Sequence, residues 1–92
     1  MKKIGFIGMG NMASAIAGGI IKSGFIDGQN VYAFDIDSDK LAKMNSKFEI
    51  IGCKSEIDLV ETVDMIVMAV KPNIVEDVIL KVKAKLENKA VI

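Results

Sequence analysis

The residues with the most specific spacing in this chain are the glycines that interrupt its first apolar run, which reads IGFIGMGNMA. Gly8 suits a tight turn out of a strand, and Gly10 would let a pyrophosphate approach the backbone without meeting a Cβ. Ala13 would let the following helix pack closely on the sheet. The N–H groups of Gly10, Asn11 and Met12 would then face phosphates at a helix N-terminus. This spacing predicts dinucleotide binding, and a glycine-rich turn in a non-binding α/β domain is the alternative.

A carboxylate follows the second apolar run, VYAFD, at Asp35, 25 residues beyond Gly10. In a dinucleotide-binding fold this position reaches the adenosine ribose, where a carboxylate accepts bonds from the hydroxyls and repels a 2′-phosphate. Asp35 therefore favours NAD over NADP, unless it is only a turn residue that starts the loop. Ser38 and Lys40 could instead hold a phosphate if the loop turns them inward.

The segment AVKP follows a continuous apolar run, and ligands of doubly wound sheets bind at such carboxyl ends of strands. Its backbone is expected to border the ribose and nicotinamide side of the cofactor. Lys71 is the candidate general acid, but a solvated lysine before a proline is the commoner case. We therefore assign no catalytic residue to this chain.

Composition limits the other functions. The chain has 92 residues, enough for one small domain, and its 12 basic and 12 acidic side chains cancel. No basic field is present to recruit nucleic acid or an anionic membrane. Without any histidine, histidine-based triads and histidine-ligated zinc sites are excluded. Cys53 is alone, so no disulfide framework or metal cluster is expected, in keeping with a cytoplasmic location.

Lys2, Lys3 and the apolar run that follows them imitate a secretion signal. Five glycines between positions 4 and 21 would make a poor membrane helix, since each costs about 1 kcal/mol relative to alanine. We therefore assign the run to a strand and a helix.

Apolar periodicity predicts alternating strands and helices. The expected strands cover 3–8, 31–35, part of 48–53, 65–70 and a start at 90–92; the expected helices cover 11–23, 39–47, a short one from 55, and one after Pro72. The predicted caps are Ser38, Ser55 with Asp58, and Asn73 with Glu76. The predicted inward positions are Met12, Ala13, Ile16, Ala17, Ile20 and Ile21, then Leu41, Ala42 and Met44, then Val75, Val78, Ile79, Val82 and Leu86.

Strict alternation with short loops predicts an α/β, Rossmann-type doubly wound parallel sheet, truncated at about the fifth strand. Three apolar residues, 90–92, are an odd natural terminus. We expect residues 1–92 to be the NAD(P)-binding part of a longer enzyme.

Two blocks, IGFIGMGNMASAI and DMIVMAVKP, together with the Gly18–Gly19 pair, resemble the pyrroline-5-carboxylate reductase family. The resemblance implies hydride transfer from NAD(P)H to the C=N bond of 1-pyrroline-5-carboxylate, giving L-proline. It implies NADP or NAD as cofactor: the family default is NADPH, and Asp35 leans toward NAD. The cofactor contacts that it implies are Ile7, Gly8, Met9, Gly10, Asn11, Met12, Asp35, Ala69, Val70, Lys71 and Pro72.

The family continues into a helical domain that forms the dimer and supplies most of the substrate site. We therefore expect a homo-oligomer at full length, no turnover by this fragment alone, and neither nucleic-acid nor membrane partners. Two alternatives share the opening motif. One is the cofactor domain of a β-hydroxyacid or 6-phosphogluconate type dehydrogenase, and the other is a non-catalytic reductase homologue that senses a nucleotide.

Overall fold

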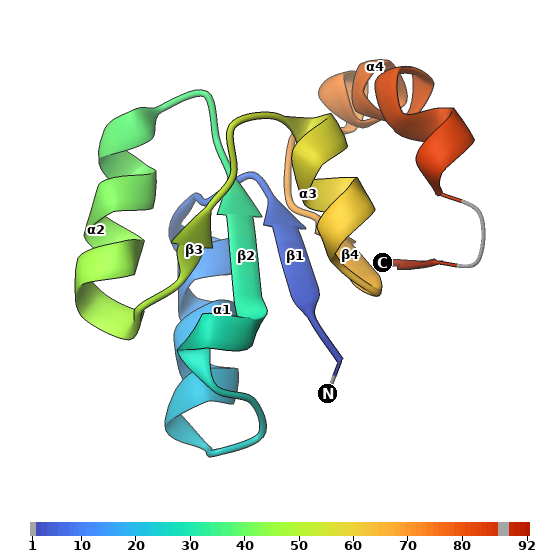
Figure 1. Ribbon diagram of the computed structural model, residues 1–92. Helices are drawn as coiled ribbons and strands as arrows, with labels where there is room; N and C mark the ends of the chain where they lie inside the picture. The colour runs from blue at the N-terminus through green and yellow to red at the C-terminus, as the bar shows by residue number, and fades with distance from the viewer. Residues whose placement is uncertain (1, 87–88) are drawn as a thin grey trace.

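The computed structural model describes residues 2–86 and 89–92, in which strands and helices alternate as predicted (Figure 1). The strands are β1 (Ile4–Ile7), β2 (Val31–Phe34), β3 (Ile51–Gly52), β4 (Met65–Met68) and β5 (Ala90–Val91). The α-helices are α1 (Asn11–Lys22), α2 (Ser38–Phe48), α3 (Glu56–Thr62) and α4 (Pro72–Val82). Two short 3-10 turns, Gly28–Asn30 and Lys83–Lys85, precede β2 and follow α4.

All five strands are parallel and form one sheet in the order β3-β2-β1-β4-β5. β1 is central: Ile4–Ile7 pair with Val31–Phe34 on one side and with Met65–Met68 on the other. The strand order reverses between β1 and β4, which makes the carboxyl ends of these strands a switch point of the sheet. The predicted doubly wound Rossmann-type sheet, ending with a short fifth strand, is confirmed.

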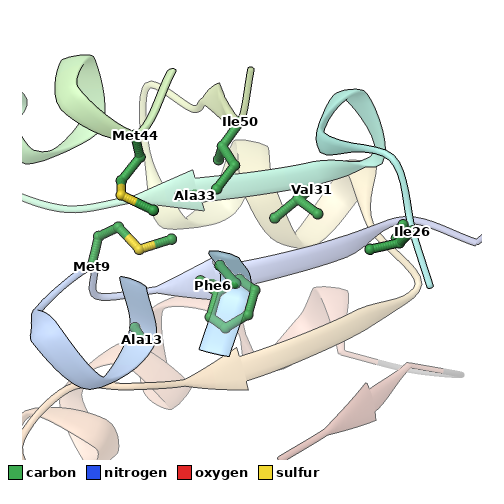
Figure 2. Packing of buried hydrophobic residues seen from close by; sticks show 9 residues of the cluster. Phe6, Met9, Ala13, Ile26, Val31, Ala33, Met44 and Ile50 are labelled. Atoms are coloured by element: carbon green, nitrogen blue, oxygen red, sulfur yellow. The ribbon is translucent and has the colours of Figure 1, made fainter. Parts of the chain in front are cut away.

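Each face of the sheet is covered by two helices. Phe6 and Ala33 point toward α1 and α2 and pack with Ala13 and Met44 (Figure 2). Ile7 and Ile66 point the other way and pack under α3 and α4. The side chains of neighbouring residues in β1 therefore pack in the hydrophobic cores on opposite faces of the sheet, because side chains alternate along a strand.

Glycines let the helices lie close to their neighbours. A Cβ at Gly5 would come within 2.6 Å of the Leu59 side chain, so α3 packs directly on the backbone of β1. A Cβ at Gly18 would lie 2.8 Å from the Phe48 ring, which shows how closely α1 and α2 approach. The second contact holds the C-terminal end of α2 against the C-terminal half of α1.

Three predicted inward positions are wrong. The Met12 side chain is 79% exposed and that of Ile16 48% exposed, and Ala42 also faces solvent. α1 meets the sheet through the small side chains of Ala13 and Ala17, four residues apart on one stripe. A neighbour one position earlier is rotated by about 100° around the helix axis, so it points away from the sheet.

Two predicted caps are also wrong, whereas the Ser55 cap is confirmed by a bond from Asp58 N to Ser55 Oγ at 3.1 Å. Asp37, not Ser38, caps α2, because its extended backbone lets Oδ1 accept from Asp39 N at 3.0 Å. α4 begins at Pro72 itself with no side-chain cap. Proline at the first helical position keeps Lys71 extended and has no N–H to satisfy, so Asn73 already lies inside the helix.

β4 ends at Met68, two residues earlier than predicted, so Ala69–Lys71 form a loop between β4 and α4. Within the described residues, no helix is both long and apolar enough to cross a bilayer.

Candidate dinucleotide site

The loop between β1 and α1 is held tightly where it leaves the strand. Gly8 has φ +96°, and a Cβ there would lie 2.7 Å from the carbonyl oxygen of Ala69. Gly8 N donates to Phe34 O at 2.8 Å, and Ala69 N donates to Ile7 O at 2.9 Å. The turn is therefore clamped between the ends of β2 and β4, and it tolerates no side chain at this position.

Two residues later the same loop is open. Gly10 is the N-cap residue of α1 and contributes no side-chain cap; a Cβ there would meet nothing within 4 Å. Across the part of the chain that the structure describes, the N–H groups of Gly10, Asn11 and Met12 have no hydrogen-bond acceptor. Such unpaired donors at the positive end of a helix dipole can bind an anion.

Asp35 lies immediately after β2, as predicted, and its carboxylate is bonded to the glycine-rich loop. Oδ2 accepts from Met9 N at 2.7 Å, and Oδ1 accepts from Asp37 N at 2.9 Å. The first bond joins two loops that are 26 residues apart in the chain. Sequence reasoning placed Asp35 at this edge but missed the bond, because no local pattern encodes a contact of that range.

The AVKP segment lies beside the glycine-rich loop, through the contact between Ala69 and Gly8. Val70 is half-buried, while Ala69, Lys71 and Pro72 are exposed. Lys71 makes no ion pair with any described residue. The structure thus brings the two sequence-predicted segments and Asp35 together at the switch point.

Two cavities flank this loop. The smaller, about 100 Å³, has mainly apolar walls that include Ile36, Val70 and Ile74, with Glu56 at its margin. Ile36 is 94% exposed, an unusual position for a large aliphatic side chain. Glu56 Oε2 lies 3.4 Å from Lys81 Nζ, and this pair connects α3 to α4 beside the cavity.

The larger flanking cavity, about 410 Å³, lies between α1 and α2. Its walls come from the loop and first turn of α1 and from one side of α2: Met9, Gly10, Asn11, Ser14, Lys40, Lys43, Met44 and Lys47. Met9 and Met44, two of these lining residues, face one another in Figure 2. Sequence analysis named Lys40 but missed Lys43 and Lys47, although their spacing of three and four residues places all three on one helix side.

A third cavity, about 490 Å³, lies at the opposite edge of the sheet between Ile4, Phe25 and Met65. It is remote from the glycine-rich loop, and its lining contains none of the residues predicted to contact the cofactor. The size of a cavity therefore does not decide where the candidate site lies, and the unpaired N–H groups favour the glycine-rich loop at the switch point.

Reactive and metal-binding groups are scarce. Cys53 is half-buried, and burial, assisted by the Asp58 carboxylate, raises the pKa of its thiol. The thiol is therefore protonated at neutral pH and a weak nucleophile. Among residues 2–86 and 89–92, no group of three histidine, cysteine, aspartate or glutamate side chains could hold a metal ion.

Comparison with known proteins places this geometry among reductases. A pyrroline-5-carboxylate reductase from Escherichia coli K12 is 35% identical over 91 residues, which cover 99% of this chain and 34% of that protein. The structure of the Coxiella burnetii pyrroline-5-carboxylate reductase superposes with a TM-score of 0.88 at 30% identity, over 96% of this chain and 32% of that one. The structure of the Plasmodium falciparum pyrroline carboxylate reductase with NADP bound superposes with a TM-score of 0.83 at 30% identity, over 98% of this chain and 32% of that one.

The chain therefore spans about a third of the length of the curated relatives that it matches. Residues 3–92, nearly the whole chain, match the family described as NADP oxidoreductase coenzyme F420-dependent. With the parallel sheet, the clamped turn at Gly8 and the open helix N-terminus at Gly10, this match establishes that the chain belongs to that family.

Proposed function

We propose that the chain is the dinucleotide-binding part of a pyrroline-5-carboxylate reductase, which reduces 1-pyrroline-5-carboxylate to L-proline. The observation that carries this proposal is the open N-terminus of α1, where three N–H groups have no acceptor among the described residues and a Cβ at Gly10 would meet nothing within 4 Å. The names of the relatives supply the substrate and the reaction. Over the whole reaction, a hydride reaches the carbon of the C=N bond and a proton reaches its nitrogen.

The chain's own residues bind and orient the cofactor. The N–H groups of Gly10, Asn11 and Met12 donate to the pyrophosphate, and their strength comes from being preorganised in the helix. Asp35, beside Met9, faces the adenosine ribose. When bound, a nicotinamide dinucleotide supplies the hydride.

The remaining proposed contacts follow from position. Ile7 ends β1 under the loop, and Ala69–Pro72 border the nicotinamide side, where their backbone limits the approach of water. Lys71 lies on the nicotinamide side, and we assign it no catalytic role.

The substrate site and a homo-oligomer interface belong to the longer protein that the relatives represent. Hydride transfer needs the acceptor carbon held over the nicotinamide, and we assign that task to the rest of the longer protein. We place the protein in the cytoplasm, without nucleic-acid or membrane partners.

Two measurements test the proposal. Titration of the chain with NADPH and with NADH, followed by nicotinamide fluorescence, should show saturable binding of at least one. Gly10→Val is the matched variant: it should fold and lose binding of both. The full-length protein should oxidise NAD(P)H only when 1-pyrroline-5-carboxylate is present. A folded chain that binds neither dinucleotide, or a full-length protein that is inert toward this substrate, contradicts the proposal.

A further inference from the structure

The cavity of about 490 Å³ lies away from the proposed dinucleotide site, at the amino ends of the central strands. Ile4 begins β1, Met65 begins β4, and the two residues pair in the sheet. The glycine-rich loop leaves β1 at its other end, after Ile7. Pockets for small molecules have volumes of roughly 300–1,000 Å³, so this cavity has room for a ligand of its own.

The ring of Phe25 forms part of the wall of this cavity. Phe25 is 78% exposed, although burial of so large an apolar surface is favourable. The backbone beneath the ring is held in place, because Phe25 N donates to Ile20 O at 3.2 Å. Together with the half-buried side chains of Ile4 and Met65, the ring gives the cavity a mainly apolar wall that can cover a hydrocarbon group.

Two side chains of opposite charge line the same cavity. Neither the Lys2 ammonium group nor the Asp27 carboxylate makes an ion pair or a hydrogen bond with any described residue. Asp27 precedes the 3-10 turn at Gly28–Asn30 without capping it through its side chain. The residue before it, Ile26, is buried, and its N–H group has no acceptor among the described residues. Because buried N–H groups are almost always bonded, this donor is available to water or to a ligand.

These groups together match a free α-amino acid. An ammonium group and an N–H group bind a carboxylate through charge-assisted hydrogen bonds, and a carboxylate binds an ammonium group in the same way. The apolar wall accommodates a hydrocarbon side chain, whose burial is favourable by about 25 cal/mol per Å². A pure hydrocarbon would leave both charges at the cavity unpaired, and a dianion would be repelled by the Asp27 carboxylate. A zwitterion with an apolar side chain satisfies all of these groups.

We propose that this cavity binds a free α-amino acid with a large apolar side chain. Lys2 and the N–H group of Ile26 hold the carboxylate of the ligand, and the Asp27 carboxylate holds its ammonium group. The side chain of the ligand packs against Phe25 and Met65. The inference does not rest on the proposed function. Because the two sites lie at opposite ends of β1, an amino acid and a dinucleotide should bind at the same time.

L-phenylalanine is the probe, because it carries a carboxylate, an ammonium group and an apolar side chain. Hydrocinnamate lacks the ammonium group, and phenethylamine lacks the carboxylate. Calorimetric titration of the chain should show a millimolar or lower dissociation constant for L-phenylalanine and values at least about tenfold higher for each analogue. Binding of either analogue as tightly as L-phenylalanine, or no binding of L-phenylalanine at millimolar concentration, would overturn the inference.

Charge variants assign the two ends of the ligand. Asp27→Asn should raise the dissociation constant of L-phenylalanine at least about tenfold without weakening hydrocinnamate, which has no ammonium group for Asp27 to bind. Lys2→Gln should weaken L-phenylalanine without weakening phenethylamine, which has no carboxylate. Asp77→Asn on α4 is the matched control and should change none of these constants. A variant at Lys2 or Asp27 that weakens all three ligands equally would contradict the assigned contacts.

Added dinucleotide separates this site from the proposed cofactor site. L-phenylalanine should bind equally well with and without saturating NADPH or NADH, and the amide NMR shifts that it causes should centre on residues 24–27. Displacement by a dinucleotide, or shifts centred on the glycine-rich loop, would place the probe at the switch point and overturn this inference alone. If neither dinucleotide binds while L-phenylalanine still does, the proposed function fails and this inference stands.

Discussion

The two sides of the glycine-rich loop differ in how completely the protein fills them. On the β4 side, which we call the closed side, Gly8 is packed against Ala69, and Cys53 and Glu56 are half-buried around α3. On the α2 side, the open side, Gly10 meets nothing, and the ammonium groups of Lys40 and Lys43 have no partner among the described residues.

This difference indicates which polar groups serve the fold and which await a ligand. Folded proteins pair their buried polar groups, and no buried side-chain nitrogen or oxygen lacks a partner in the described residues. Of the residues with unpaired N–H donors, Gly10 and Asn11 border an open cavity, where water or a ligand can satisfy those donors. A substitution at Gly8 should therefore change stability, and a substitution at Gly10 should change binding.

The largest effect is expected for Gly8→Ala on the closed side. The new Cβ meets a backbone carbonyl at 2.7 Å with φ at +96°, so the strand end must shift. We expect a loss of about 2–4 kcal/mol in the free energy of unfolding, measured by urea titration. A loss below about 1 kcal/mol would show that the turn is looser than the structure indicates.

Gly10→Ala is the matched change on the open side. Its backbone, with φ −74° and ψ −172°, accepts alanine, so stability should fall by about 1 kcal/mol or less. Dinucleotide affinity should fall at least about tenfold, because the Cβ occupies the path of the pyrophosphate. Calorimetric titration measures the dinucleotide affinity. An affinity equal to that of the wild type would mean that Gly8 and Gly10 do not differ in the way proposed.

Asp37→Ala should cost about 1 kcal/mol of stability through loss of the α2 cap. Ser38→Ala, one residue later, should change stability by less than about 0.5 kcal/mol. Thermal unfolding of the two variants measures both stability losses. The result bears on the open side because α2 carries the lysines there. Equal losses would mean that Ser38 shares the capping role.

The smallest effect concerns Cys53 on the closed side. Because its pKa is raised, less thiolate exists at a given pH, and alkylation by iodoacetamide at pH 8 should be slower than that of an unstructured cysteine peptide. Asp58→Asn removes the lesser cause and should speed the reaction by roughly twofold. A rate equal to that of the peptide would show that the thiol is not shielded.

Local patterns predicted the strands, the helices and the tight turn at Gly8, because apolar periodicity and glycine spacing act over a few residues. They failed where neighbouring candidates look alike, as with Asp37 and Ser38, or Ala13 and Met12. Local patterns also failed to predict contacts between elements that are far apart in the sequence. The Asp35–Met9 bond and the approach of Lys43 to Gly10 exist only because β2 and α2 pack beside the first helix.

The central position of β1 has a consequence for synthesis on the ribosome. By the end of β3, at Gly52, the emerging chain can form β3-β2-β1 with α1 and α2 on one face. Ile7, Tyr32 and Phe34 on the other face then await α3 and α4, which end at Val82. At roughly 5–20 residues per second, an apolar surface stays uncovered for about 2–6 s. Chaperone contact with the nascent chain should therefore concentrate on this face and end once α4 has emerged.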